Sequence, residues 1–324
     1  MNTFKHILNS IRTYVKKFLE LMKKPLSMVI FVVSIFIILL TLIESGAFSR
    51  YFTTLIILIL VMIVMSTSLN IATGFLGQLH LGHAAFMGIG AYTASLVALA
   101  LEDSITNPLL LFILSTIVAM IVAGIASLLV GTPALRLRGD YLGIMTLGFG
   151  EIVKTMITNL KDITNGAQGL YGIPRIMDFP IAYWTTVLVV LVIYLFMNSR
   201  HGRAIISIKE DEIASESVGI NITKYKLLGF VLASMFAAIG GAMFAFRIGF
   251  LAPVNFNFLK SVEIFVIVIL GGMGSLSGSI VASIVLVSLP EILRSLEDYR
   301  FLLYSTLLIV MMLFRPQGLL GHKE

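Results

Sequence analysis

Long apolar runs alternate with short polar segments along almost the whole chain. A transmembrane helix needs about 20 apolar residues to cross a bilayer core of about 30 Å. The eighth and ninth runs are short and glycine-rich, so broken or re-entrant helices are an alternative to full crossings there. The fifth run is interrupted by Glu151 and Lys154. The pattern predicts an all-α, polytopic membrane bundle of about ten transmembrane helices, over segments 26–43, 53–72, 83–101, 108–130, 141–160, 181–197, 226–250, 260–272, 275–290 and 301–314.

Composition agrees with a chain whose outer surface faces lipid. Hydrophobic residues make up 58% of the 324 residues and charged residues 12%, and the mean hydropathy is +1.00. A soluble domain carries about 25% charged residues. The chain has no cysteine, which excludes disulfides and thiolate metal sites. The first apolar run lacks a clear cleavage site, so we expect it to be a retained signal anchor.

Basic residues predict the orientation and the division of the chain. With the N-terminus in the cytoplasm, most of the 23 lysines and arginines fall on the cytoplasmic side, and both termini lie there. The predicted parts are a basic amphipathic segment (1–25), a membrane domain (26–314) with a cytoplasmic loop (198–225), and a cytoplasmic tail (315–324). The net charge of +6 therefore indicates topology and not a nucleic-acid partner.

The cytoplasmic loop carries the pattern of a short amphipathic helix. Gly202 and Gly219 bracket a predicted helix of about 14 residues, too polar to span the bilayer. Its apolar edge would consist of Ile205, Ile208, Ile213 and Val218. Such a helix is suited to docking in a groove of another protein. The alternative is a helix on the membrane surface that only connects two spans.

Polar groups inside the predicted spans are the candidate functional positions. His80 and His83 could meet one metal on a helix, but two ligands without a nearby carboxylate or cysteine make a poor site, and none is expected. Gln78 and His83 are better interpreted as facing a cavity or bonding across helices. Glu151 either pairs with Lys154 or Lys161, or lines a translocation pathway.

Four ordered motifs resemble the branched-chain amino acid ABC permeases of the LivH/LivM family. Residues 77–92 (GQLHLGHAAFMGIGAY) are similar to the third-helix segment of that family, and residues 202–221 to its cytoplasmic loop. Residues 138–152, which include Thr146 and Glu151, and the ending 314–321 resemble the LivM branch. His80 departs from the family's usual serine. Ser277 and Ser279 stand where tryptophan and proline are frequent.

The resemblance implies roles for three groups of residues. An ATPase-docking site would comprise Gly202, Arg203, Ala204, Ile208, Glu210, Asp211, Glu212, Ala214 and Gly219. The translocation pathway would include Gln78, His83, Thr146 and Glu151. The turn-rich segment 164–170 resembles an external segment of the LivM branch, so it is either a contact for a substrate-delivering protein or an ordinary loop, with the candidate residues Asn165, Gly166 and Gly169.

The same resemblance implies partners and a substrate class. They are a second, LivH-like permease, two ATPase subunits, an extracytoplasmic binding protein and the lipid bilayer, in a bacterial or archaeal plasma membrane. The chain lacks the P-loop pattern G-x-x-x-x-G-K-[ST], so ATP is expected on the partners, with no cofactor here and no enzyme activity. Leucine, isoleucine and valine are the expected substrates. Urea, amides or other amino acids are alternatives, as is a gradient-driven carrier.

Overall fold

The computed structural model describes residues 25–134 and 140–293, together with 305, 306, 309, 313 and 318–320. It divides into two compact units, 1–53 and 54–324. In the first unit, helix α2 (Pro25–Glu44) carries the first predicted span. Nearly all of the predicted basic segment 1–25, and most of the tenth span and of the tail, lie outside the described residues.

A helix occupies each of the first nine predicted spans. Six of these helices are long and apolar enough to cross a membrane by length and composition, and among the described residues the only β-pairing is a single bridge, Leu170 to Leu251. After α2 the elements are α3 (Arg50–Asn70), the π-helix η1 (Ile71–Phe75), α4 (His83–Leu101), α5 (Pro108–Ala134), α6 (Asp140–Asn159), α7 (Lys161–Thr164), η2 (Gly166–Gln168), α8 (Phe179–Met197), α9 (Arg200–Glu210), α10 (Glu212–Ser217), α11 (Ile222–Ile248), η3 (Pro253–Phe256), α12 (Phe258–Gly271) and α13 (Leu276–Ile292). The all-α membrane fold is therefore confirmed.

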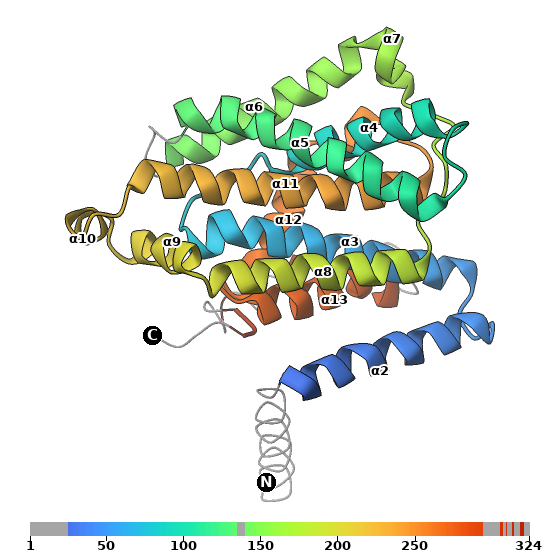
Figure 1. Cartoon of the computed structure of the whole chain (residues 1–324), viewed down its shortest axis with the longest axis horizontal. Helices are drawn as coiled ribbons and strands as arrows, with labels where there is room; N and C mark the ends of the chain where they lie inside the picture. The colour runs from blue at the N-terminus through green and yellow to red at the C-terminus, as the bar shows by residue number, and fades with distance from the viewer. Residues whose placement is uncertain are drawn as a thin grey trace, which may run out of the picture. The chain divides into compact units, whose positions relative to one another are not determined.

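The centre of the second unit is the crossing of α4 and α11, against which α5 packs (Figure 1). Glycines bring the two backbones together. A β-carbon at Gly90 would lie 2.3 Å from the Cα of Ala238, and one at Gly241 would lie 2.0 Å from the carbonyl oxygen of Met87. Small residues at helix crossings are typical of membrane bundles, where close packing replaces the hydrophobic effect.

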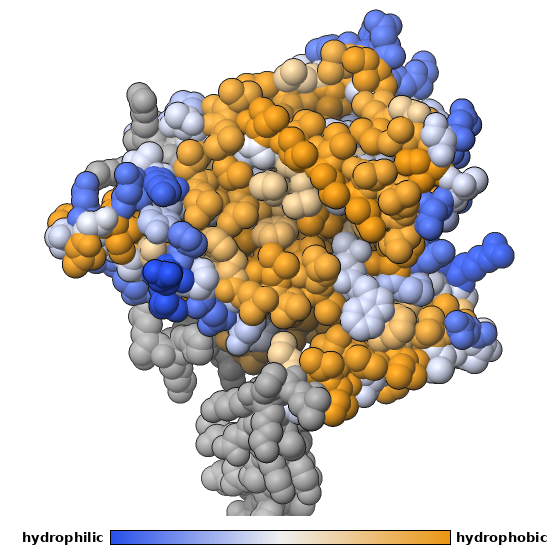
Figure 2. Space-filling view, viewed as in Figure 1, coloured by the Kyte–Doolittle hydropathy of each residue, from blue (hydrophilic) through white to orange (hydrophobic). Residues whose placement is uncertain are grey.

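The outer surface of α5 and α8 is apolar. Figure 2 shows hydrophobic side chains over the middle of these helices and hydrophilic ones toward their ends. The exposed side chains are aliphatic or aromatic, such as Ile125 on α5 and Leu188 on α8. Since lipid tails offer no hydrogen-bond partners, surfaces of this kind fit a bilayer.

Two of the connections between predicted spans interrupt helices at irregular backbone. After α3, one π-helical turn leads into residues 76–82, which form no helix. Helices α12 and α13 have 14 and 17 residues. At 1.5 Å per residue they are about 21 and 25 Å long, less than the bilayer core of about 30 Å. They pack on each other across a turn in which Gly272 and Gly274 have φ of 106° and 85°. Two short helices joined by a glycine turn are compatible with the broken or re-entrant alternative that the sequence offered.

Candidate functional site

The two interruptions meet at the side chain of Asn70, the last residue of α3. Its amide nitrogen donates to the carbonyl oxygen of Ser275 at 3.0 Å and to the hydroxyl of Ser279 at 2.9 Å. Its amide oxygen accepts from the backbone nitrogen of Gly274 at 2.9 Å. Asn70 is fully buried. A single amide therefore satisfies the backbone of the α12–α13 turn where water cannot.

Residues 76–82 are held by side chains from two other helices. The backbone nitrogen of Leu81 donates to the hydroxyl of Thr146 on α6 at 3.1 Å. At the start of α4, the backbone nitrogen of Ala84 donates to the hydroxyl of Ser261 on α12 at 3.0 Å. The predicted pathway residue Thr146 thus lies against the interrupted segment and supplies one of its missing hydrogen bonds.

Several buried polar atoms of this segment have no protein partner. The Nε2 atom of His83 lies 2.9 Å from the hydroxyl of Ser68, but its Nδ1 atom is unpaired. Both ring nitrogens of His80 and the amide oxygen of Gln78 are also buried and unpaired. The His80 ring packs against His83, with centroids 5.5 Å apart, and against Phe230 at 4.8 Å. Most buried polar groups in proteins are hydrogen-bonded. This concentration of unpaired polar atoms therefore marks the segment as a candidate functional site.

Within the described residues, no three His, Cys, Asp or Glu side chains come together in a way that could hold a metal ion. The predicted pathway residues Gln78, His83 and Thr146 instead gather around the interruption between η1 and α4. The fourth, Glu151, lies apart from them on another face of α6.

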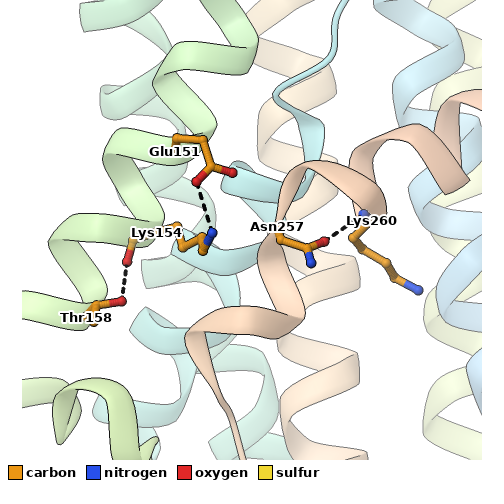
Figure 3. A network of polar contacts seen from close by, with 5 residues as sticks. All are labelled: Glu151, Lys154, Thr158, Asn257 and Lys260. Atoms are coloured by element: carbon orange, nitrogen blue, oxygen red, sulfur yellow. Dashed lines mark hydrogen bonds and ion pairs between the residues drawn. The ribbon is translucent and has the colours of Figure 1, made fainter.

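Glu151 forms an ion pair with Lys154 one turn later, at 3.0 Å (Figure 3). Both side chains remain partly exposed, at 44% and 34%. Of the two partners expected from sequence, Lys154 is the one in contact. Glu151 also lines an open pocket of about 460 Å³, together with Gly148, Ile152, Thr155, Met156, Asn159 and Leu160. The two interpretations of Glu151 are therefore compatible, since it is paired and also faces open space.

The cytoplasmic loop differs from the prediction of one helix with one apolar edge. Asp211 is extended and separates α9 from α10. Its carboxylate accepts from the backbone nitrogens of Ile213 and Ala214 at 2.9 and 3.0 Å, which is a helix N-cap. Ile205 and Ile208 are buried against the bundle, whereas Ile213 and Val218 are 82% and 76% exposed. The single-helix prediction was wrong because an aspartate in the middle of the segment begins a second helix.

The other predicted docking residues fall into two groups. Gly202 and Ile208 are buried, and Ala204 and Glu212 are half-buried. Glu212 forms an ion pair with Lys226, which ties α10 to α11. The exposed group consists of Arg203, Glu210, Asp211, Ala214 and Gly219. The buried members hold the loop in place and the exposed members remain available to a partner.

Helix α9 also touches the interrupted segment. It packs against η1, and a β-carbon at Gly77 would lie 3.1 Å from Cγ of Lys209. Gly77 has φ of 73°, a backbone conformation that other residues rarely adopt. The predicted cytoplasmic loop therefore lies against the same interrupted segment around which the predicted pathway residues gather.

The predicted external segment is a tight and well-bonded turn. Asn165 has φ of 61°, and its amide donates to the carbonyl of Gly169 at 3.1 Å. The backbone of Leu170 exchanges two hydrogen bonds with Leu251, at 2.8 and 3.1 Å. A β-carbon at Gly169 would lie 2.5 Å from the carbonyl oxygen of Leu251. Asn165, Gly166 and Gly169 are thus explained by the shape of the turn, which presents Ala167 and Gln168 outward.

Comparison with known proteins identifies the family. Residues 51–314 match the family described as the branched-chain amino acid transport system / permease component. The chain belongs to this family. This permease is 36% identical over 295 residues to the high-affinity branched-chain amino acid transport system permease protein LivM of Salmonella typhimurium, with 81% of this chain and 68% of the relative covered. The LivM protein of Escherichia coli is also 36% identical, over 297 residues. The LivH protein of Salmonella typhimurium is 26% identical over 287 residues, or 87% of this chain and 84% of the relative. No solved structure matches.

The family match covers nearly the same part of this permease as the second compact unit, and it leaves α2 outside. Sequence reasoning missed Asn70, Ser68 and Ser261, which make hydrogen bonds at the interruptions of the permease. Asn70 could have been found, because it is an amide at the end of a long apolar run. Serines are too common in membrane helices to be singled out in this way.

Proposed function

We propose that this chain is a permease subunit of an ATP-driven importer for branched-chain amino acids in a bacterial or archaeal plasma membrane. The observation that carries the proposal is the family match over nearly the whole membrane-spanning part of the chain. ATP binds to two partner ATPase subunits, an extracytoplasmic protein delivers the substrate, and a LivH-like permease completes the membrane part. The chain itself carries no cofactor and catalyses no reaction. It alternates between two conformations whose populations are set by the state of the ATPases.

The ATPases dock on α9 and α10. Exposed apolar side chains on an ordered element support this assignment, because Ile213 and Val218 extend from a helix that Asp211 caps and that Lys226 holds through Glu212. A helix of this kind fits a groove on another protein. The contact of α9 with Gly77 gives the motion of the ATPases a direct route to residues 76–82.

The substrate passes beside the interruption between η1 and α4. Unpaired polar atoms of Gln78 and His83 can bond alternately to protein, water or substrate as the helices move. Irregular backbone at membrane depth is tolerated where it is buried in protein or lines a cavity, and transporters use such interruptions at their binding sites. Glu151 faces a second part of the pathway, the open pocket on the outer side of α6, and the turn at Asn165–Gly169 lies at the external mouth.

ATP-dependent leucine uptake in proteoliposomes tests this proposal. The vesicles would contain this chain, its neighbouring permease, the ATPase pair and the binding protein. The docking role is tested by the double variant Ile213→Asp, Val218→Asp. Both side chains are exposed, so the charges should spare the fold and prevent the ATPases from binding. Thr223→Asp is the control for added negative charge, because it places one aspartate at an exposed site near the start of α11.

We expect uptake by the wild-type chain and by Thr223→Asp, and loss of uptake and of ATPase co-purification in the double variant. If urea, an amide or another amino acid is transported and leucine is not, the substrate assignment is wrong and the transporter class stands. If the chain transports leucine alone, without ATP and with sensitivity to an uncoupler, it is a gradient-driven carrier.

A further inference from the structure

Helix α6 differs from the other outer helices in the chemistry of its exposed face. Its outer face consists of Gly148, Glu151, Ile152, Thr155, Met156, Asn159 and Leu160, which line the same open pocket. Apolar and polar residues are mixed there, and Lys154 adds a second charge. On α5 and α8 the large exposed side chains, such as Ile125 (54%) and Leu188 (59%), belong to wholly apolar faces. The three helices therefore do not face the same surroundings.

The charges on this face lie within the fifth predicted span, 141–160. Glu151 and Lys154 are in the second half of a 20-residue helix, with a further turn of α6 beyond them. A charged side chain near the centre of a lipid-facing helix costs about 2.5–3.5 kcal/mol on insertion scales. The ion pair is also half open to its surroundings. A lipid environment would leave its remaining hydrogen-bonding capacity unsatisfied, whereas a protein partner or water held between two proteins would not.

The neighbouring helix α12 also carries a partly exposed ion pair. Helix α6 packs against η3 and α12. Near the start of α12, Lys260 and Glu263 form another partly exposed ion pair at 2.9 Å. The backbone nitrogen of Lys260 is bonded to the side chain of Asn257, in the same region as Glu151 and Lys154 (Figure 3). Two ion pairs on adjacent helices make a broad surface that is unsuited to lipid.

We infer that the α6 outer face is the surface on which the second membrane-spanning permease subunit packs. The inference rests on the proposed function, which requires such a subunit. The position of Glu151 and Lys154 inside a predicted span argues against a soluble partner, and the two partly exposed ion pairs argue against lipid as the main neighbour. The open glycine fits a helix–helix contact, because a β-carbon at Gly148 would meet nothing within 4 Å in the chain alone. The pocket beside Glu151 then becomes an enclosed polar space between the two permeases.

Photo-crosslinking from single cysteines tests this surface, since the chain has no cysteine of its own. The variants Thr155→Cys and Asn159→Cys place a thiol on the α6 outer face. Ile125→Cys and Leu188→Cys are controls on the apolar faces of α5 and α8. Each thiol is modified with benzophenone maleimide in the complete, ATPase-bound complex, in which the second permease carries a tag. We expect the two α6 probes to crosslink to the tagged subunit with a yield several-fold above both controls.

Equal yields from all four probes would overturn the inference, as would crosslinks from α6 only to lipid or to another part of this chain. The same preparations are assayed for leucine uptake. If uptake is normal and the α6 probes miss the second permease, the proposed function stands and the inference falls. If the wild-type complex does not form or does not transport leucine, it is the proposed function that has failed.

A size variant gives an independent measurement. Gly148→Trp fills open space in the isolated chain, so its melting temperature should stay near that of the wild type, while co-purification of the second permease should fall several-fold. Ile125→Trp adds a bulky side chain on the α5 face and should leave co-purification unchanged. If both variants retain the partner equally, the α6 outer face is not the contact.

Discussion

Asn70 shows how one polar side chain can support an interruption in a membrane helix. Its amide makes three hydrogen bonds to the α12–α13 region, two of them to backbone atoms of Ser275 and Gly274. Around it, Gly74 leaves no room for a side chain, since a β-carbon there would lie 1.6 Å from the Asn70 amide oxygen. The bonds and the glycine together hold η1 against the turn of the second interruption.

We expect Asn70→Leu to destabilise the chain strongly. The substitution keeps the branching of the side chain but leaves buried partners unpaired, at about 1–3 kcal/mol for each. The measurement is the thermal unfolding midpoint of the detergent-solubilised protein. Ser95→Ala is the control, because Ser95 is also fully buried but bonds only to its own helix, at the carbonyl of Ala91. Equal shifts in the two variants would show that Asn70 has no special role.

Asp211 supports the predicted cytoplasmic loop in a similar way to Asn70, because its carboxylate caps the N-terminus of α10. Loss of an N-cap costs about 0.5–2 kcal/mol, and asparagine caps as well as aspartate. We therefore expect Asp211→Ala to unfold α10 and reduce ATPase co-purification, and Asp211→Asn to retain it. If Asp211→Asn is as defective as Asp211→Ala, the charge of Asp211 matters in its own right and the cap is not the explanation.

At the scale of elements, the bundle depends on crossings that only glycine permits. The α4–α11 crossing brings Gly90 against Ala238 and Gly241 against Met87. The interrupted helices depend on the same residue type, because Gly77, Gly272 and Gly274 have positive φ. Close crossings pack the centre tightly, while the interruptions place non-helical backbone beside it. The contact of α9 with that segment joins the predicted docking loop to the non-helical part of the bundle.

We expect Gly90→Ala to lower the unfolding midpoint, because the new methyl group would lie 2.3 Å from a backbone atom of α11. Forcing such groups into a packed core costs about 1–3 kcal/mol. Gly148→Ala is the matched control within another helix, and its methyl group would meet nothing within 4 Å. The isolated chain carrying Gly148→Ala should be as stable as the wild type, and equal losses in both variants would contradict the crossing argument.

For the whole molecule, the distribution of charge and of exposed loops predicts the orientation in the membrane. The turn at 165–169 and the docking loop lie near opposite ends of the long helices that connect them, such as α8 (Figure 1). The sequence prediction places the docking loop in the cytoplasm and the turn outside.

Single thiols at exposed sites check this orientation. Ala167→Cys lies in the turn and Ser217→Cys lies in α10, and both positions are exposed. In intact cells, a membrane-impermeant maleimide should label Ala167→Cys at once and Ser217→Cys only after the membrane is opened. Labelling in the reverse order would show that the chain has the opposite orientation, and the docking proposal would then be wrong.

The sequence by itself determined the class of fold, the positions of nine helices and the family. Its signals were the lengths of apolar runs, which the bilayer thickness dictates, and four motifs in a fixed order. It also supplied the predicted docking segment and the predicted pathway residues, whose roles remain predictions. These are local properties that a single stretch of chain carries.

Only the tertiary structure decided which polar groups are paired and where the interruptions meet. The bonds of Asn70 to Ser275 and Ser279 join positions far apart in the chain, and nothing local specifies them. Nothing local specifies that Ile205 is buried while Ile213 in the same loop is exposed, or that the Glu151 side chain is partly exposed. Each of these features depends on which residues of a neighbouring helix lie opposite. Helix packing decides this, and the spacing of residues along the chain does not.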